Sequence, residues 1–226
     1  MTDLRLVIFD VDGTLVDSQA DIIAAMNATF EIEGLPPPAP PAIIAIVGLS
    51  LEVAIARLHP SLPDTQLDRM VQGYKDAYIA LRGSSPVEQT SPLYPQAREV
   101  LLALHAQPAT LLAVATGKSR RGLDKLLEGH GLDRMFVSQQ VSDHHPSKPH
   151  PAMILAALSE TGIDAGRAVM IGDTTYDMDM ARAAGVKSIG VTWGYHPAET
   201  LRADALIDCF ADLPAALDAL WSLNDE

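Results

Sequence analysis

Short apolar runs alternate with amphipathic segments along the second half of the chain, and one further apolar run lies near its start. Five runs rich in branched aliphatic residues predict strands, at 4–9, 111–115, 168–171, 188–191 and 205–207. Helical patterns lie between the later runs. Strands that alternate with helices are typical of a parallel sheet covered on both faces. The pattern therefore predicts an α/β protein with a doubly wound, Rossmann-like parallel sheet.

Two segments between these runs carry clear helix signals. Pro95 is expected in the first turn of a helix whose apolar stripe contains Ala97, Leu101 and Leu104. A second helix is predicted over 175–184, where a glycine follows. Both helices fit the crossovers of a parallel sheet, and neither carries functional information.

The interval between residues 17 and 93 is much longer than the single helix of a simple crossover. Ser18 is a good N-cap for a helix that ends near Gly34. The apolar positions of that helix are Ile22, Ile23, Met26 and Phe30. A stiff, polyproline-like connector is expected next at 36–41.

Three more helical stretches fit within 42–82, before Ser84-Ser85-Pro86 and Ser91-Pro92 lead back. The whole interval reads as a second domain built only from helices. We therefore predict a core domain over 1–16 and 91–226 and an inserted helical domain over 17–90.

Composition excludes several classes of protein. The chain has 226 residues and a formal net charge of −13, which argues against a nucleic-acid surface. The longest uncharged run, 100–117, contains His105 and Pro108 and does not read as a membrane span. Cys209 is the single cysteine, so no intramolecular disulfide forms. With no export signal visible, we expect a cytoplasmic protein in which local positive charge captures any anion.

Asp10 and Asp12 follow the first predicted strand. Alternate side chains of a strand share a face, so both carboxylates are expected to project into one crevice at its carboxyl end. Two neighbouring carboxylates can divide the work, since one attacks while the other carries a proton. Gly13 is expected to turn the backbone and to leave nearby N–H groups facing an anion.

Polar residues follow other predicted strands in a fixed order: Thr116-Gly117-Lys118, then Lys148, then Asp173 and Asp177. Ligands of open α/β sheets lie outside the carboxyl ends of the strands, so these groups are expected to converge. Each group alone is more typical of a structural role, such as a helix N-cap for Asp12 or Asp173, a strand-end hydroxyl for Thr116, or a solvated Lys148. The order of all four is what indicates chemistry.

A cluster of aspartates needs a cation. Two carboxylates 4 Å apart repel by about 4 kcal/mol at an effective dielectric constant of 20. Oxygen ligands without histidine or cysteine favour a hard ion, and Mg²⁺ characteristically combines one or two carboxylates with waters and a substrate phosphate. We therefore expect Mg²⁺ rather than Ca²⁺.

With these motifs in order, the chain resembles the haloacid dehalogenase superfamily, in the subgroup with a helical cap inserted after the first strand. It is especially similar to phosphoglycolate phosphatases. The resemblance runs from Asp10-Val11-Asp12-Gly13-Thr14, through Thr116, Lys148-Pro149 and Gly172-Asp173 with Asp177, to the strand end at 190–195.

The resemblance implies a role for each motif residue. Asp10 would attack a phosphate monoester to give an aspartyl-phosphate, and Asp12 would protonate the leaving alcohol and then activate water. Thr116, the Gly117 N–H group and Lys148 would hold the phosphoryl oxygens. Mg²⁺ would be bound by the Asp10 carboxylate, the Asp12 carbonyl and Asp173, with Asp177 acting from a second shell or through water.

The cap is expected to select the substrate by closing over it. Gly48 and Ser50 lie in the segment expected to enter the crevice and contact the substrate, although a plain interhelical turn fits this segment equally well. The basic residues of the insert are Arg57, Arg69, Lys75 and Arg82. Any one of them is a candidate to bind a substrate carboxylate, although a solvated position on the surface is more typical of each. Tyr74 and Asp76 around Lys75 give no sign of the desolvation that a Schiff-base lysine needs.

These observations predict a Mg²⁺-dependent phosphatase of small phosphorylated metabolites, with 2-phosphoglycolate as the first candidate substrate. The alternatives are a phosphomutase similar to β-phosphoglucomutase and a pyrophosphatase of the same superfamily. Asp12 argues against carbon–halogen cleavage, because dehalogenases of the family lack the second aspartate. A phosphoacceptor module is disfavoured because receiver domains are about half this length and have no insert. Both a monomer and a homodimer remain compatible with the sequence.

Overall fold

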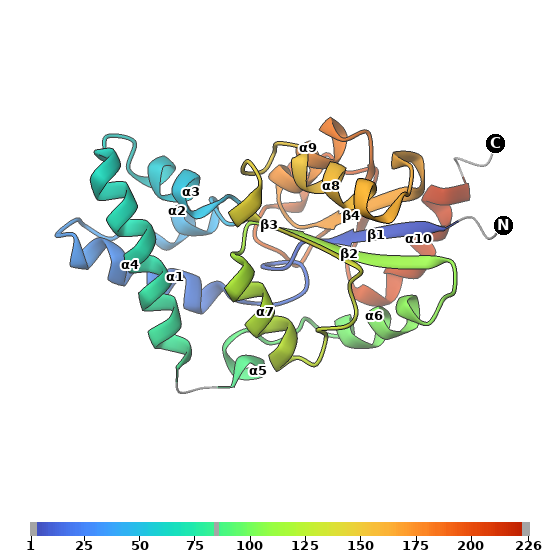
Figure 1. The fold of residues 1–226 in the computed structure, drawn as a ribbon, viewed down its shortest axis with the longest axis horizontal. Coiled ribbons are helices and arrows are strands. Elements are labelled where there is room, and N and C mark those ends of the chain that lie inside the picture. The colour runs from blue at the N-terminus through green and yellow to red at the C-terminus, as the bar shows by residue number, and fades with distance from the viewer. Residues whose placement is uncertain (1–3, 84–85, 223–226) are drawn as a thin grey trace.

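The computed structural model describes residues 4–83 and 86–222. Its described part contains a six-stranded parallel sheet in the order β3-β2-β1-β4-β5-β6 (Figure 1). The strands are β1 (Arg5–Phe9), β2 (Thr110–Thr116), β3 (Ser138–Val141), β4 (Ala168–Gly172), β5 (Lys187–Val191) and β6 (Ala205–Ile207). Because β1 lies between β2 and β4, the loops that follow these three strands meet at one edge of the sheet.

Helices cover both faces of the sheet, which confirms the predicted doubly wound α/β class. They are α6 (Ala97–His105), α7 (Arg120–Gly129), α8 (Ala152–Thr161), α9 (Thr175–Ala183) and α10 (Leu213–Ser222). Alternate residues of β1 face opposite layers. Val7 and Phe9 pack in the cluster that includes α6, α7 and α10 residues, whereas Leu6 and Ile8 pack with α8 and α9 residues.

Five of the strands follow the predicted apolar runs, and β3 was not predicted. Its sequence, Ser138-Gln139-Gln140-Val141, is mostly polar, and β3 lies at one edge of the sheet beside β2. Ser138 and Gln140 are nevertheless buried, and Gln140 Nε2 donates to Ser138 Oγ at 2.8 Å. Short single-turn helices precede or follow several strands, at Ser142–His144, Ala165–Arg167, Ala198–Thr200 and Phe210–Asp212.

A helical unit separates β1 from β2 and lies beyond the edge of the sheet, on the left of Figure 1. It consists of α1 (Gln19–Ile32), α2 (Pro40–Ile44), α3 (Leu51–Leu58) and α4 (Asp64–Arg82), which we call the cap. The cap has a hydrophobic cluster of its own, formed by Ile22, Met26, Phe30, Ile43, Ile55 and Met70 among others. A short helix, α5 (Val87–Thr90), follows before the chain returns to the sheet.

Two proline predictions need correction. The connector predicted over 36–41 ends earlier, because Pro40 and Pro41 form the first turn of α2, where a missing N–H group costs nothing. Pro95 lies outside α6, which begins at Ala97 after a left-handed Gln96. The three helices predicted within 42–82 correspond to α2, α3 and α4. The predicted turn at Ser84 and Ser85 falls outside the described residues.

The chain leaves the sheet for the cap and returns from it at one place. Val16 forms an antiparallel bridge with Leu93. The Asp17 N–H group donates to the Pro92 carbonyl at 2.9 Å, and the Tyr94 N–H group donates to the Leu15 carbonyl at 3.0 Å. The domain boundaries at 16/17 and 90/91 stay predictions, and this bridge lies beside both of them.

Within 4–83 and 86–222, none of the helices combines the length and the apolar character needed to cross a membrane.

Candidate active site

Four side chains that are far apart in the sequence form a buried charge cluster at the carboxyl edge of the sheet. The Lys148 ammonium lies 2.8 Å from Asp10 Oδ1 and 2.7 Å from Asp177 Oδ1. Carboxylate oxygens of Asp10, Asp173 and Asp177 lie within 4.8 Å of one another. All four side chains are at most 1% exposed. The structure thus brings together four of the predicted site residues, whose roles stay predictions.

The sheet places these carboxylates. Asp10 directly follows β1, and its N–H group donates to Ile171 of β4 at 2.9 Å. Asp173 directly follows β4, and Asp177 lies in the first turn of α9. A Cβ atom at Gly172 would collide with the Asp177 side chain, so this glycine permits the close approach of α9 to the strand end.

Gly13 adopts a left-handed φ of 86°, and a Cβ atom there would collide with the Asp173 carboxylate. This glycine is therefore needed for both its conformation and its lack of a side chain. The prediction that it frees nearby N–H groups for an anion is wrong for the turn itself. Gly13 donates to the Val16 carbonyl at 2.9 Å, and the N–H groups of residues 14–16 donate to the Val11 carbonyl.

Hydrogen bonds orient the two aspartates that follow β4. Thr14 Oγ1 donates to Asp173 Oδ1 at 2.8 Å, and the Tyr195 N–H group donates to Asp173 Oδ2 at 2.8 Å. Asp177 forms a capping box with Thr174, whose N–H and hydroxyl groups donate to Asp177 Oδ2 at 3.0 and 2.7 Å. Sequence reasoning did not assign Thr14 or Tyr195, because their contacts span more than 20 residues.

Burial and mutual repulsion make this cluster electrostatically strained. Burial, countered by Lys148 and reinforced by Asp177, raises the pKa of Asp10 to about 7. Burial and the charges of Asp10 and Asp177 also hold the pKa of Asp173 well above its usual range. Although burial opposes it, pairing with the carboxylates of Asp10 and Asp177 keeps the pKa of Lys148 above its ordinary value.

The cluster fits a divalent cation. It sets three carboxylates against one ammonium group, which leaves an excess of negative charge in a buried place. Asp10 Oδ2 is buried and receives no hydrogen bond from any residue that the structure describes. An oxygen-only donor set with an unused carboxylate oxygen suits a hard cation of the Mg²⁺ class.

The Asp12 side chain turns away from that cluster and makes contacts of its own. Lys118 Nζ lies 2.9 Å from Asp12 Oδ1, and Ser18 Oγ donates to the same oxygen at 2.5 Å. Tyr195 Oη accepts a hydrogen bond from the Ser18 N–H group at 3.0 Å. Ser18 was predicted as the N-cap of α1 and occupies that position, but its side chain serves Asp12 instead of the helix.

Lys118 is the residue that sequence reasoning missed most clearly. It stands in the Thr116-Gly117-Lys118 motif directly after β2, yet only the first two residues were assigned roles. The charge and the place of Lys118 at a strand end were a usable signal. Its ammonium also lies 5.3 Å from the centre of the Tyr78 ring, on the cap.

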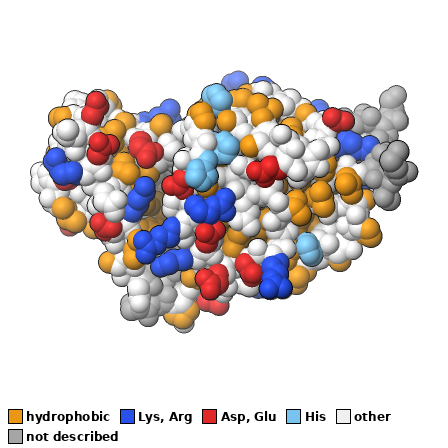
Figure 2. Space-filling view, in the orientation of Figure 1, with side chains coloured by type: hydrophobic (Ala, Val, Ile, Leu, Met, Phe, Trp, Pro, Cys, Tyr) orange, Lys and Arg blue, Asp and Glu red, His pale blue; other side chains and the backbone are white. Residues whose placement is uncertain are grey.

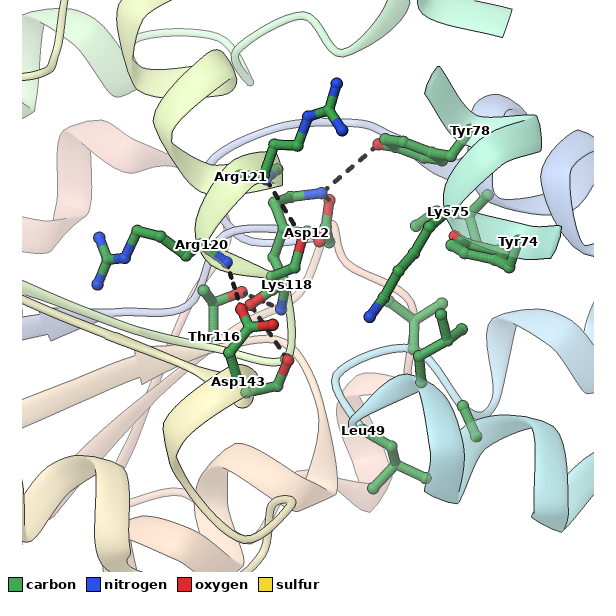
Figure 3. Close-up of a pocket in the computed structure, with 18 of the residues that line it drawn as sticks. Asp12, Leu49, Tyr74, Lys75, Tyr78, Thr116, Lys118, Arg120, Arg121 and Asp143 are labelled. Carbon is green, nitrogen blue, oxygen red and sulfur yellow. Dashed lines mark hydrogen bonds and ion pairs between the residues drawn. The ribbon is translucent and has the colours of Figure 1, made fainter. Parts of the chain in front are cut away.

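A cleft of about 800 Å³ lies between the cap and the core, and Asp10, Asp12, Thr116, Gly117 and Gly48 all line it. Figure 3 shows Thr116 and Lys118 on the core side, facing Leu49 and Lys75 on the cap side. A Cβ atom at Gly117 would lie 2.5 Å from the Gly48 carbonyl oxygen, so cap and core backbones touch there.

Ser50 lies beside the cleft and not among the residues that line it. Its N–H group donates to Ser147 Oγ at 2.8 Å, which joins the cap to the loop before Lys148. Its side chain does not cap α3, although it occupies the N-cap position. Gly48 therefore fits the predicted entry into the crevice, and Ser50 is placed as a contact between cap and core.

Comparison with protein families identifies residues 7–191 as a match to the haloacid dehalogenase-like hydrolases. A probable phosphatase, IndB, of Dickeya dadantii is 37% identical over 226 residues, covering 97% of this chain and 96% of that protein. A phosphoglycolate phosphatase of Agrobacterium fabrum is 37% identical over 219 residues, covering 94% and 91%.

Solved structures agree with the fold. A protein from Haemophilus somnus 129pt, described as a predicted phosphoglycolate phosphatase, superimposes with a TM-score of 0.83 at 27% identity, covering 96% of this chain and 99% of that one. A haloacid dehalogenase-like hydrolase from Streptococcus pneumoniae superimposes with a TM-score of 0.80 at 28% identity, covering 96% and 99%.

Proposed function

The chain belongs to the haloacid dehalogenase-like hydrolases, and on that premise we propose that it is a cytoplasmic, Mg²⁺-dependent phosphatase of small phosphate monoesters. The observation that carries the proposal is the pairing of Lys148 with both Asp10 and Asp177. Asp10 in turn lines the cleft together with Asp12. Phosphoryl transfer depends on charge neutralisation and positioning, and this arrangement supplies both.

Asp10 is the nucleophile. Its carboxylate oxygen attacks phosphorus, the bond from phosphorus to the ester oxygen breaks, and an aspartyl-phosphate forms. Lys148 offsets the negative charge that gathers on the phosphoryl oxygens, and its ion pair at 2.8 Å holds Asp10 in one orientation. Thr116 and the Gly117 N–H group, which line the cleft beside Asp10, bind the remaining phosphoryl oxygens.

Asp12 handles the protons. It donates a proton to the departing alcohol oxygen and then takes one from the water that attacks the aspartyl-phosphate, which returns Asp10 as a carboxylate. Lys118 and Ser18 both contact Asp12 Oδ1 and so fix the direction in which the other oxygen points.

Asp10, Asp173 and Asp177 would hold the Mg²⁺ ion, with the Asp12 carbonyl as a further predicted ligand. The bound ion supplies positive charge that offsets the phosphate and the aspartates together. Thr14 and the Tyr195 N–H group hold Asp173 in place for this task.

The substrate proposal draws on the relatives. The protein of Agrobacterium fabrum and one of Caulobacter vibrioides, 36% identical over 217 residues, both carry the name phosphoglycolate phosphatase. We therefore put 2-phosphoglycolate first among the substrates, which makes glycolate and inorganic phosphate the products.

The test is release of inorganic phosphate from 2-phosphoglycolate in the presence of Mg²⁺. The Asp10→Asn variant is expected to lose at least about 1,000-fold in kcat, because an amide is not a nucleophile. Asp208→Asn is the matched control, since that carboxylate is exposed and accepts a hydrogen bond from Thr192 Oγ1. Turnover of Asp10→Asn at the wild-type rate would refute the mechanism. Isomerised sugar phosphate without release of phosphate would instead indicate a phosphomutase.

A further inference from the structure

Basic side chains gather at the cleft although the molecule as a whole is acidic. The chain carries a formal net charge of −13, yet Figure 2 shows Lys and Arg side chains gathered where the cap meets the core. The basic residues that line the cleft are Lys75, Lys118, Arg120, Arg121 and Lys125. Seven carboxylates also line it, so only a cation that no carboxylate already holds is available to an incoming anion.

Two of these cations already have strong partners in the protein. Lys118 pairs with Asp12 at 2.9 Å. Arg120 donates to Gln139 Oε1 at 2.8 Å and to the Gln139 carbonyl at 2.5 Å, and it lies 3.5 Å from Asp124. These contacts fix both side chains in the wall of the cleft, where they orient protein groups.

Among the three cap cations whose side chains the structure describes, Arg57, Arg69 and Lys75, the same reasoning selects one. Arg69 forms a two-pronged ion pair with Glu33 on the outside of the cap. Arg57 donates to the Tyr176 hydroxyl at 2.6 Å and lies over that ring. Lys75 is half-buried, lines the cleft, and has no ion-pair or hydrogen-bond partner within the part of the chain that the structure describes.

The surroundings of Lys75 favour an incoming anion. Figure 3 shows its side chain reaching from α4 into the space between Leu49 and the loop that carries Thr116 and Lys118. Arg121 points away from Thr116. Apolar side chains also line this space, including Ile22, Met26 and Ile46. An unpaired ammonium group against apolar walls gains more from a partner than an exposed one does.

We propose that Lys75 is a specificity-determining residue, whose ammonium binds a second anionic group on the alcohol part of the substrate. A carboxylate or a second phosphate meets this description equally well. The inference rests on the proposed phosphatase function and names the substrate class: phosphate monoesters with an anion at each end. Asp10 and Lys148 take the scissile phosphate, and Lys75 takes the other end across the cleft.

The experiment compares substrates that differ in the second anion alone. 2-Phosphoglycolate is paired with 2-hydroxyethyl phosphate, and 3-phosphoglycerate with glycerol 3-phosphate. Ethane-1,2-diol bisphosphate tests a second phosphate in place of the carboxylate. Each is assayed for kcat and KM with wild type, Lys75→Met, Lys75→Arg and Arg69→Met. Arg69→Met is the control, because it removes one positive charge from the same helix without touching the cleft.

In at least one pair, wild type is expected to show a higher kcat/KM for the ester that carries the second anionic group. Lys75→Met is expected to lower kcat/KM for that ester by about 10- to 100-fold, mainly through KM, and to change the neutral partner by less than about twofold. Lys75→Arg is expected to keep part of the preference, and Arg69→Met all of it. The substrate whose kcat/KM falls most in Lys75→Met shows whether the second anion is a carboxylate or a phosphate.

Other outcomes overturn the inference. Equal losses on charged and neutral partners in Lys75→Met would make Lys75 a structural residue of the cap. Absence of any wild-type preference would leave the phosphatase intact and remove the role of Lys75. Absence of phosphate release from every ester would refute the proposed function itself, and this inference with it.

Discussion

Lys118 Nζ lies 2.9 Å from Asp12 Oδ1, although the two residues come from the loops after different strands. The pair fixes the carboxylate that is proposed to protonate the leaving alcohol. We expect Lys118→Met to lower kcat by about 10-fold or more on an alkyl phosphate. The loss should be smaller on p-nitrophenyl phosphate, whose leaving group needs little protonation.

Steady-state rates on both esters check this prediction, with Lys125→Met as the control. Lys125 lines the same cleft and is exposed, and it makes no contact with Asp12 in the described structure. Losses of equal size on both esters would indicate that Lys118 acts on binding and not on the proton donor.

Lys148→Met is expected to destabilise the fold as well as to abolish turnover. Removing a buried ammonium leaves the Asp10 and Asp177 carboxylates uncompensated, which typically costs about 3–5 kcal/mol of unfolding free energy. Urea unfolding in the presence of a chelator measures it. The double variant Asp10→Asn, Lys148→Met removes one of those carboxylates, so it should recover part of the loss. A double variant less stable than Lys148→Met would contradict the charge argument.

The metal-free protein is expected to lose stability as the pH rises. The folded-state pKa of Asp10 is raised to about 7 and that of Asp173 is also raised. A carboxyl whose pKa rises on folding stabilises the fold fully below its unfolded pKa, and this contribution disappears as the pH passes the folded value. Each tenfold change in proton affinity is worth about 1.4 kcal/mol. Unfolding free energy in chelator should therefore fall from about pH 4 to about pH 7, the range between the ordinary and the folded pKa of Asp10.

Two further measurements, on Asp173→Asn and with added Mg²⁺, test whether these carboxylates cause the fall of unfolding free energy with pH. The variant keeps the shape of the side chain without its titration, so its stability should depend less on pH over the same range. Saturating Mg²⁺ should flatten the wild-type curve and raise its melting temperature, because a ligand that binds only the folded state stabilises it. A wild-type curve that rises with pH in chelator would contradict the proposed strain among these carboxylates.

Gly13→Ala is expected to damage both the turn and the site. The left-handed φ of 86° costs an alanine about 1–2 kcal/mol. Its Cβ atom would also displace the Asp173 carboxylate. Thermal unfolding and Mg²⁺-dependent turnover should both fall, whereas Gly166→Ala, which would meet no neighbouring atom, should change neither. Unchanged turnover in Gly13→Ala would show that Asp173 has room to move.

The sequence predicts the site better than it predicts the contacts around it. Asp10, Thr116 and Asp173 were found because each follows an apolar run, and parallel strands end at one edge. The roles of Ser18 and Tyr195 depend on tertiary contacts with Asp12 and Asp173, which no local pattern encodes.

The same limit explains the remaining differences. The edge strand β3 was missed because two of its buried residues, Ser138 and Gln140, are polar and hydrogen-bond to each other, so it contains no apolar run. The basic residues of the cap were indistinguishable in the sequence. Among those whose side chains the structure describes, Arg57 and Arg69 have partners within the protein, and Lys75 lines the cleft. The ends of strands can be predicted from the local sequence pattern. The partner of a charged side chain is known only once the chain is folded.

The bridge between Val16 and Leu93 has an evolutionary consequence. Because the outgoing and returning backbones are neighbours, a different helical unit with equally close ends could be spliced between them without disturbing the sheet. Recombination at this junction would exchange the part that recognises the alcohol while the bond-breaking residues are inherited intact. Under the proposed function, the choice of substrate and the rate of hydrolysis would then be separable traits in this architecture.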